Sequence, residues 1–392
     1  MSTTGVTKVY THGTHRVRDP AETWAIMRPK FDRYGVTRVS DITGLDVFAI
    51  PVAMAVRPLA WTLSVSQGKG QSLQLAKVSA VMEAIELWHA EQAPPPVTHR
   101  DTTAEDLGLS YSVADLGVVA SPFLDDRSPL SWVSARGLVS AGTTQVPLDA
   151  VCFRDPGVHQ WSTSWIRANS NGLASGNSTE EAILHALYEV VERDALSRPV
   201  AADIAASPTL HPESIQDETC RTMIANIHAA GGRVAIQMLP SAFDIPTFKC
   251  IVWSWDFPLI CSGYGAHLDP VVALSRALTE AAQGRLATIA GSRDDLEHFH
   301  DQLQKPQRKV EYMSAFGEPN ADFDEIARRY TTTFDNTSDE LAWLVDGVQR
   351  VLDREPLVVD LSTDADFAVV KVIVPGGRLD VGRIHPRAER AS

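Results

Sequence analysis

Acidic and amide side chains recur at helical spacing in three separate segments of the chain. The segments carry Ser79, Glu83 and Glu86, then Glu181, Glu189 and Glu192, then Arg276, Glu280 and Gln283. Residues three and four apart lie on one side of a helix, so each segment can present a row of polar groups to a common cavity. Carboxylates brought together in this way repel one another unless cations lie between them. The pattern therefore indicates a site for metal ions.

Basic residues in the same segments suggest what accompanies the metal. Mg²⁺ binds carboxylate oxygens together with nucleotide phosphates, and the planar guanidinium groups of Arg193 and Arg276 would hold phosphate oxygens. The segment Gly68-Lys69-Gly70 lies between a predicted strand and a predicted helix N-terminus, where anions are favoured. It completes no phosphate-loop motif, however. A tight turn with a solvated lysine, and glutamates on solvent-facing helix surfaces, remain alternative interpretations of these residues.

The composition is that of an ordinary globular protein. Of the 392 residues, 44% are hydrophobic and 21% are charged, and the formal net charge is −14. So acidic a chain lacks the basic footprint that nucleic-acid phosphates require. No segment reaches the roughly 20 apolar residues of a membrane span, and the N-terminus does not read as a signal peptide. Four cysteines without zinc or disulfide spacing predict reduced thiols. We therefore expect a cytoplasmic protein with neither a nucleic-acid nor a membrane partner.

The elements that would position the first acidic row lie in the N-terminal quarter of the chain. Apolar spacing predicts a helix over residues 20–34 that Gly35 ends. Strands are predicted within residues 47–65, leading into a turn at residues 68–70. A helix over residues 73–91 should follow, with two stripes. Its core stripe would hold Leu75, Val78, Met82, Ile85 and Trp88, and its cavity stripe Ala76, Ser79, Glu83 and Glu86.

Later segments alternate between strands and helices. The glycine-containing stretch at residues 170–172 should open a helix that runs from residue 177 to about 196. Buried strands are predicted at residues 233–239, 248–255, 357–360 and 367–374, and a long helix at residues 270–290. Residues 100–165 suggest loops and short strands, and residues 294–339 suggest surface helix with loops. The fold class is therefore mixed α+β.

The three blocks that carry these polar residues are similar to those of the YcaO family of ATP-dependent enzymes that modify peptide backbones. The matching text is Ser66-Gln-Gly-Lys-Gly70 with residues 79–86, Ser170-Asn-Gly172 continuing to Asn177, Glu181 with residues 189–194, and residues 276–285. The likeness spans about residues 10–300. It implies a multi-lobed α+β fold around a central nucleotide pocket. We expect a single catalytic domain over residues 1–380, which could divide near residues 100 and 270, and a frayed tail at residues 381–392.

The resemblance also implies which residues hold Mg²⁺ and ATP. The expected metal ligands are Glu83, Glu86, Glu189 and Glu192. In the family, a basic residue and a hydroxyl near the N-terminus also reach the nucleotide, and Arg16 and Thr23 occupy those places here. The remaining nucleotide contacts would come from Ser66, Lys69, Ser79, Asn177, Glu181, Arg193, Arg276, Glu280 and Gln283.

The branches of the family differ in the nucleophile that attacks the activated amide. A neighbouring side chain gives an azoline, sulfide gives a thioamide, and an amine gives an amidine. The C-terminal residues of this sequence lack the alternating prolines of the azoline branch, and residues 13–16, 279–283 and 290–295 resemble the branch that works with a TfuA partner. The resemblance thus implies a thioamide-forming homodimer with a separate TfuA-like protein and a peptide substrate that carries a leader. An azoline- or macroamidine-forming enzyme and a non-catalytic nucleotide-binding scaffold are the alternatives.

Overall fold

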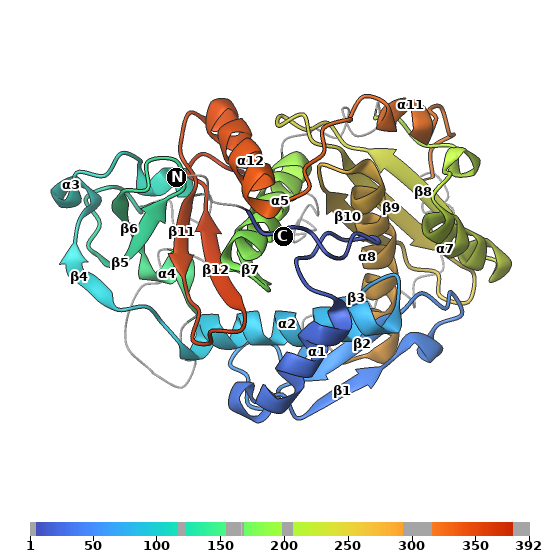
Figure 1. Ribbon diagram of the computed structural model, residues 1–392, viewed down its shortest axis with the longest axis horizontal. Coiled ribbons are helices and arrows are strands. Elements are labelled where there is room, and N and C mark those ends of the chain that lie inside the picture. The colour runs from blue at the N-terminus through green and yellow to red at the C-terminus, as the bar shows by residue number, and fades with distance from the viewer. Residues whose placement is uncertain are drawn as a thin grey trace, which may run out of the picture.

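A computed structural model shows how these segments fold. It describes residues 5–116, 123–153, 166, 168–197, 207–292 and 316–378. Within these ranges the strands form three antiparallel sheets, which Figure 1 shows as three groups arranged around helices α2, α5 and α8. The predicted mixed α+β class is confirmed.

The N-terminal sheet carries the first acidic helix. Its strands pair in the order β1 (Arg38–Asp41), β2 (Val52–Val56), β3 (Val65–Lys69), and helices α1 (Pro20–Met27) and α2 (Leu73–Gln92) pack beside it. Two 3₁₀ turns extend α1 to Tyr34, where Gly35 adopts a left-handed φ of 67°. Glycine tolerates that conformation without strain, so the predicted stop at Gly35 is confirmed.

The predicted turn at residues 68–70 is wrong, because Gly68 and Lys69 belong to β3. A Cβ atom added to Gly68 would lie 2.0 Å from the backbone nitrogen of Ala80 and 2.1 Å from the carbonyl oxygen of Ala76. Gly68 is therefore a site of close packing between β3 and α2. The assignment of Ala76 to the cavity stripe was also wrong, since Ala76, Ala80 and Ala84 are fully buried.

The second sheet unites strands that lie far apart in the sequence. Its order is β4-β5-β11-β12-β7, with β6 also paired to β5. The strands are β4 (Val97–Thr102), β5 (Leu130–Gly137), β6 (Thr143–Pro147), β7 (Leu173–Gly176), β11 (Leu357–Asp360) and β12 (Ala368–Ile373), with the short helices α3 (Ala104–Leu107) and α4 (Leu148–Val151) between them. The two predicted late strands are confirmed. Because β7 pairs with β12, this sheet crosses the suggested sub-lobe borders, and the division of residues 1–380 into domains stays a prediction.

The third sheet positions the last acidic helix. Its order is β10-β9-β8, with β8 (Arg233–Met238), β9 (Thr247–Trp253) and β10 (Cys261–Ala266). Helix α8 (Pro270–Ala290) packs closely on β10, because Gly263 and Gly265 let the helix backbone approach the strand. The predicted bounds of α8 are confirmed. Helices α7 (Glu218–Ala229) and α11 (Phe323–Ala327) complete this part of the fold.

Helix α5 (Thr179–Ser197) lies at the centre of the molecule and packs against β7, β12 and α12 (Thr337–Leu352). The hydroxyl of Ser178 accepts a hydrogen bond from the backbone nitrogen of Glu181 at 3.1 Å and so caps the helix start. The glycine turn at residues 170–172 does not open α5, contrary to the prediction, because strand β7 lies between them.

The N-terminal segment is fixed across the centre of the fold (Figure 1). Thr7 bridges to Asn336 next to α12, and the buried Lys8 forms an ion pair with Glu340. All four cysteines are free and buried. Among the helices in the described ranges, none combines the length and apolarity needed to cross a membrane. The predicted C-terminal tail lies outside the described residues.

Candidate nucleotide and metal site

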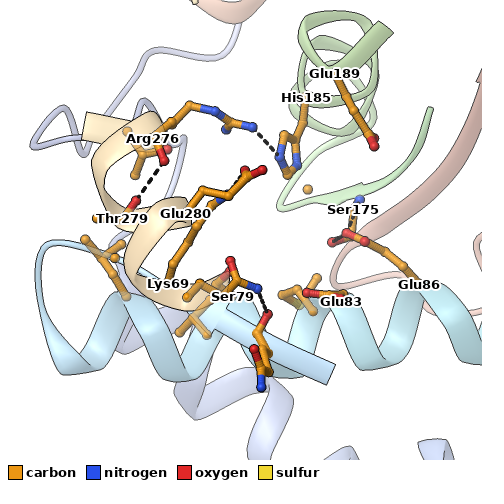
Figure 2. Close-up of a pocket in the computed structure, with 18 of the residues that line it drawn as sticks. Lys69, Ser79, Glu83, Glu86, Ser175, His185, Glu189, Arg276, Thr279 and Glu280 are labelled. Atoms are coloured by element: carbon orange, nitrogen blue, oxygen red, sulfur yellow. Dashed lines mark hydrogen bonds and ion pairs between the residues drawn. The ribbon is translucent and has the colours of Figure 1, made fainter. Parts of the chain in front are cut away.

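One cavity of about 520 Å³ collects the polar rows of α2, α5 and α8 (Figure 2). Strand β3 and the N-terminal segment complete its wall. The predicted site residues that line it are Arg16, Thr23, Lys69, Ser79, Glu83, Glu86, Asn177, Glu181, Glu189, Glu192, Arg193, Arg276, Glu280 and Gln283. The structure thus brings together residues from four separate stretches of the chain.

Ser66 is the exception among the predicted residues. It is only 2% exposed and lies outside the cavity lining, and its hydroxyl has no hydrogen-bond partner in the part of the chain that the structure describes. Successive side chains of a strand point to opposite faces, so Ser66 lies on the face of β3 that Gly68 presents to α2. Gln67 and Lys69 line the cavity instead. The structure therefore places Ser66 outside the cavity that the other predicted residues line, and its neighbour Gln67 inside it.

Helix α2 places Glu83 and Glu86 at the cavity. The Oε1 atom of Glu86 accepts two hydrogen bonds from Ser175 in β7, one from the backbone nitrogen at 2.8 Å and one from the hydroxyl at 2.5 Å. Burial, together with the charges of the nearby Glu83 and Glu189 carboxylates, raises the pKa of Glu86 to about 8, although the hydrogen bonds from Ser175 oppose this shift.

Helix α5 places Glu189 across the cavity from α2 (Figure 2), and Glu192 on the same helix also lines the cavity. Glu189 accepts a hydrogen bond from the backbone nitrogen of Gly172 at 3.2 Å, and Arg193 lies 3.8 Å from both carboxylates. Burial raises the pKa of Glu189, and burial together with the charge of Glu280 raises that of Glu192. Buried like charges therefore resist ionisation here.

Helix α8 contributes Arg276, Glu280 and Gln283 to the cavity wall. Lys69 forms an ion pair with Glu280, and Gln283 donates to the carbonyl oxygen of Gln67 at 2.9 Å. Arg276 lies 3.5 Å from Nε2 of His185, which must be the acceptor because a guanidinium only donates. Burial and the charge of Arg276 lower the pKa of His185 well below its ordinary value, so the imidazole is neutral.

The N-terminal segment reaches the same cavity through Glu181. Arg16 lies 3.6 Å from this carboxylate, which also accepts from the backbone nitrogen of Val17 at 2.8 Å. Thr23 donates to the side-chain oxygen of Asn177 at 2.8 Å, and Asn177 donates in turn to Glu181 at 3.0 Å. Arg16 and Thr23, which the resemblance alone suggested, therefore lie beside Asn177 and Glu181.

Several lining residues were missed from the sequence. The polar ones are Thr14, Arg18, Gln67, Gln71, Ser170, Ser175, His185, Ser262, Ser275 and Thr279. Gln67 could have been found from its alternation with Lys69, and His185 from its position midway between Glu181 and Glu189. Leu75, Val78 and Met82 also line the cavity, although the sequence predicted them in the core. Ala76, Ala80 and Ala84 face the core instead, because α2 packs so closely on β3 at Gly68 that larger side chains do not fit there.

The donor set fits Mg²⁺ accompanied by a polyanion. Among the described residues, six carboxylates and no cysteine line the cavity, and Mg²⁺ prefers oxygen ligands. In the described ranges no group of three or more acidic, histidine or cysteine side chains has the geometry of a metal site. The Nε atoms of Arg193 and Arg276 are buried and have no hydrogen-bond partner among the described residues, so these donors suit phosphate oxygens.

Sequence comparisons agree with this arrangement. The family model for a YcaO cyclodehydratase that binds ATP and Mg²⁺ matches residues 67–378. An uncharacterized protein of Mycobacterium tuberculosis is 38% identical over 94% of this chain and 84% of its own length. A protein of Rhizobium leguminosarum bv. trifolii, described as lying in the tfuA 3′ region, is 35% identical over 93% of this chain and 89% of its own length.

Solved structures share the fold. YcaO from Methanopyrus kandleri bound with AMPPCP and Mg²⁺ is 26% identical to this chain with a TM-score of 0.72. The match covers 95% of each of the two chains. A heterocyclase in complex with substrate and cofactor has a TM-score of 0.73 at 21% identity, and the match covers 96% of this chain and 54% of the heterocyclase. At this identity the match shows a shared fold and nothing more. The predicted use of ATP and Mg²⁺ is confirmed. The chain belongs to the YcaO family of ATP-dependent peptide-modifying enzymes.

Proposed function

We propose that the chain is a Mg-ATP-dependent enzyme that replaces a peptide backbone amide oxygen with sulfur. The product would be a thioamide in a ribosomally made peptide or a protein. The observation that carries the proposal is the relative in the tfuA 3′ region, which matches this chain over nearly its whole length. A separate TfuA-like protein is therefore the proposed partner. The proposal also includes a cytoplasmic homodimer, each subunit a single catalytic domain over residues 1–380, and a substrate with a leader.

The residues of the cavity divide into two tasks. Glu83, Glu86, Glu189 and Glu192 would hold Mg²⁺, because they are the carboxylates that the cavity gathers between α2 and α5. Lys69, Arg193, Arg276 and Arg16 would neutralise phosphate oxygens. When bound, Mg-ATP supplies a phosphoryl group to the amide oxygen, so that this oxygen leaves as phosphate after a sulfur nucleophile has added to the amide carbon.

The remaining wall residues would position and shield the reacting groups. Leu75, Val78 and Met82 give α2 an apolar surface that excludes water from one side of the cavity. The neutral imidazole of His185 accepts from Arg276 and so holds that guanidinium toward the cavity. Fixed charges in a site with little water stabilise developing charge without reorganisation, which is the largest contribution that such a cavity can make.

A second candidate is cyclodehydration to an azoline or an amidine. The description of the matching family model as a cyclodehydratase favours it. In that reaction a nucleophile within the peptide attacks the amide, and water is lost overall. A non-catalytic nucleotide-binding scaffold is the candidate from another class. It is disfavoured because a scaffold gains nothing from like-charged carboxylates gathered in one cavity, which repel one another without a metal.

Mass spectrometry separates these candidates. The purified chain is incubated with ATP, Mg²⁺, sodium sulfide, the TfuA-like protein and the candidate peptide, with Glu83→Gln as the matched inactive variant. The proposal expects the mass change of oxygen replaced by sulfur, dependent on ATP. Loss of water would establish cyclodehydration instead. If the peptide is unchanged and nucleotide binding does not depend on Mg²⁺, the non-catalytic scaffold is the candidate that remains.

A further inference from the structure

Two elements from different sheets meet at the contact between Glu86 and Ser175. Glu86 lies on α2, beside the N-terminal sheet, whereas Ser175 lies on β7, at the edge of the second sheet. Figure 2 shows the two side chains pointing toward each other at the cavity. Ser175 is only 6% exposed, and β12 pairs with β7 along its other edge. Its position is therefore fixed by the sheet and not by the carboxylate that it binds.

The geometry of this contact is that of a two-donor clamp. The backbone nitrogen and the hydroxyl of Ser175 both donate to Oε1 of Glu86, at 2.8 Å and 2.5 Å. Neither bond occupies Oε2, which is left for a cation. Donors that are already in place fix the rotamer of a carboxylate and favour its ionised form, which is the form that binds a metal.

The surroundings of Glu86 make such a clamp necessary. The carboxylate is buried close to Glu83 and Glu189, and the negative charges of both repel it. Arg193 lies beside Glu189 and Glu192, and Lys69 pairs with Glu280, so these cations are engaged with other carboxylates. Ser175 supplies the hydrogen bonds that partly offset this repulsion.

We propose that Ser175 is a positioning residue that orients Glu86 for Mg²⁺, a role that rests on the proposed metal-binding function of Glu86. Ser175 also lines the cavity, so AMPPCP binding without metal must be measured to separate an effect on the metal from a direct contact with the nucleotide. Replacement by alanine removes the hydroxyl and leaves the backbone donor. Replacement by threonine keeps both donors.

Calorimetric titration of Mg²⁺ into the chain with saturating AMPPCP tests this role. Removal of a hydrogen-bond partner of a metal ligand weakens metal affinity by about 10- to 100-fold. We expect Ser175→Ala to raise the half-saturating Mg²⁺ concentration by that factor, with little change in metal-free AMPPCP binding, and Ser175→Thr to restore most of the affinity. The matched control is Ser254→Ala, because Ser254 is 1% exposed and lies outside the cavity lining.

The outcomes separate this inference from the function on which it rests. If the unchanged chain binds Mg²⁺ with AMPPCP and Ser175→Ala binds it equally well, the role of Ser175 is refuted and the proposed function stands. An equal loss in Ser254→Ala would also refute it, since the effect would then be one of general stability. If the unchanged chain shows no Mg-dependent binding, both proposals fail together.

Discussion

Lys69 on β3 and Glu280 on α8 form an ion pair that joins the N-terminal sheet to the third sheet at the cavity. Burial alone would raise the pKa of Glu280, but the charges of Lys69 and Arg193 bring it below its ordinary value. The lysine of the Gly-Lys-Gly segment is thus engaged with a carboxylate of the cavity and is not a solvated turn residue. In the bound state the same ammonium would lie within the phosphate site.

Loss of this ammonium should affect both stability and binding. In Lys69→Met, Glu280 stays buried beside Glu192 with one counter-charge fewer, so we expect the free energy of unfolding to fall by about 1–3 kcal/mol. Urea unfolding measures this change, and calorimetry should show weaker Mg-AMPPCP binding. Lys77→Met on α2 is the control, because Lys77 does not line the cavity. Equal losses in the two variants would argue against the assignment of Lys69.

Removal of a metal ligand should leave the ligand-free fold nearly unchanged. Glu192→Gln takes away a buried charge that Glu280 repels, so we expect the melting temperature without ligand to change by less than about 2 °C. The rise in melting temperature on addition of Mg-AMPPCP should disappear. The fully buried Ile85 provides the contrast, because Ile85→Ala should cost about 2–5 kcal/mol and keep the ligand response. A drop in Glu192→Gln as large as that of Ile85→Ala would contradict a metal-binding role.

The raised pKa of Glu86 predicts how stability varies with pH. Its folded-state pKa is about 8, above the ordinary value of 4.5, so the folded chain binds this proton more tightly than the unfolded chain. The resulting stability is fully present below pH 4.5 and is lost as pH rises through about 8. With EDTA present, the free energy of unfolding should therefore fall between these pH values, by at most about 1.4 kcal/mol per pH unit from this group.

Two comparisons isolate the contribution of Glu86. Glu86→Gln should flatten the fall in stability across this pH range, since glutamine cannot ionise. Mg²⁺ should bind the unchanged chain more tightly as pH rises, because binding releases the proton. Parallel stability profiles for the variant and the unchanged chain would show that Glu86 is ordinarily ionised and that this account of its surroundings is mistaken.

Gly68 should be intolerant of any side chain. A Cβ atom there would meet two backbone atoms of α2 at 2.0 and 2.1 Å, and helix backbone cannot yield as a flexible side chain can. We expect Gly68→Ala to lower the free energy of unfolding by more than about 3 kcal/mol. Gly44→Ala is the control, because nothing lies within 4 Å of its added Cβ. Comparable stability of the two variants in thermal unfolding would refute the packing role.

The parts of the site that the sequence could predict are those governed by helical periodicity. Glu83 and Glu86, Glu189 and Glu192, and Glu280 and Gln283 occupy rows that spacing alone assigns to one face, and the cavity confirms each row. The ends of α8 could also be predicted from the sequence, because Asp269 and Pro270 begin the helix and Gly291, at a φ of 57°, ends it.

The remainder depends on contacts between distant segments. Whether Ser66 or Gln67 faces the cavity is decided by which face of β3 packs on α2, and a short strand gives no local signal for that choice. Pairing of β7 with β12, which sets the position of Ser175, joins residues far apart in the sequence. The path of residues 5–19 across the cavity depends on anchors such as Lys8 and Glu340, so only the family resemblance suggested Arg16 and Thr23.

Crystallography of the chain with AMPPCP and Mn²⁺ tests the central claim most directly, because anomalous scattering locates the metal independently of the nucleotide. The account predicts metal peaks between α2 and α5, coordinated by carboxylates among Glu83, Glu86, Glu189 and Glu192, with phosphate oxygens completing the shell. Nucleotide and metal bound elsewhere, with these four carboxylates uncoordinated, would contradict it.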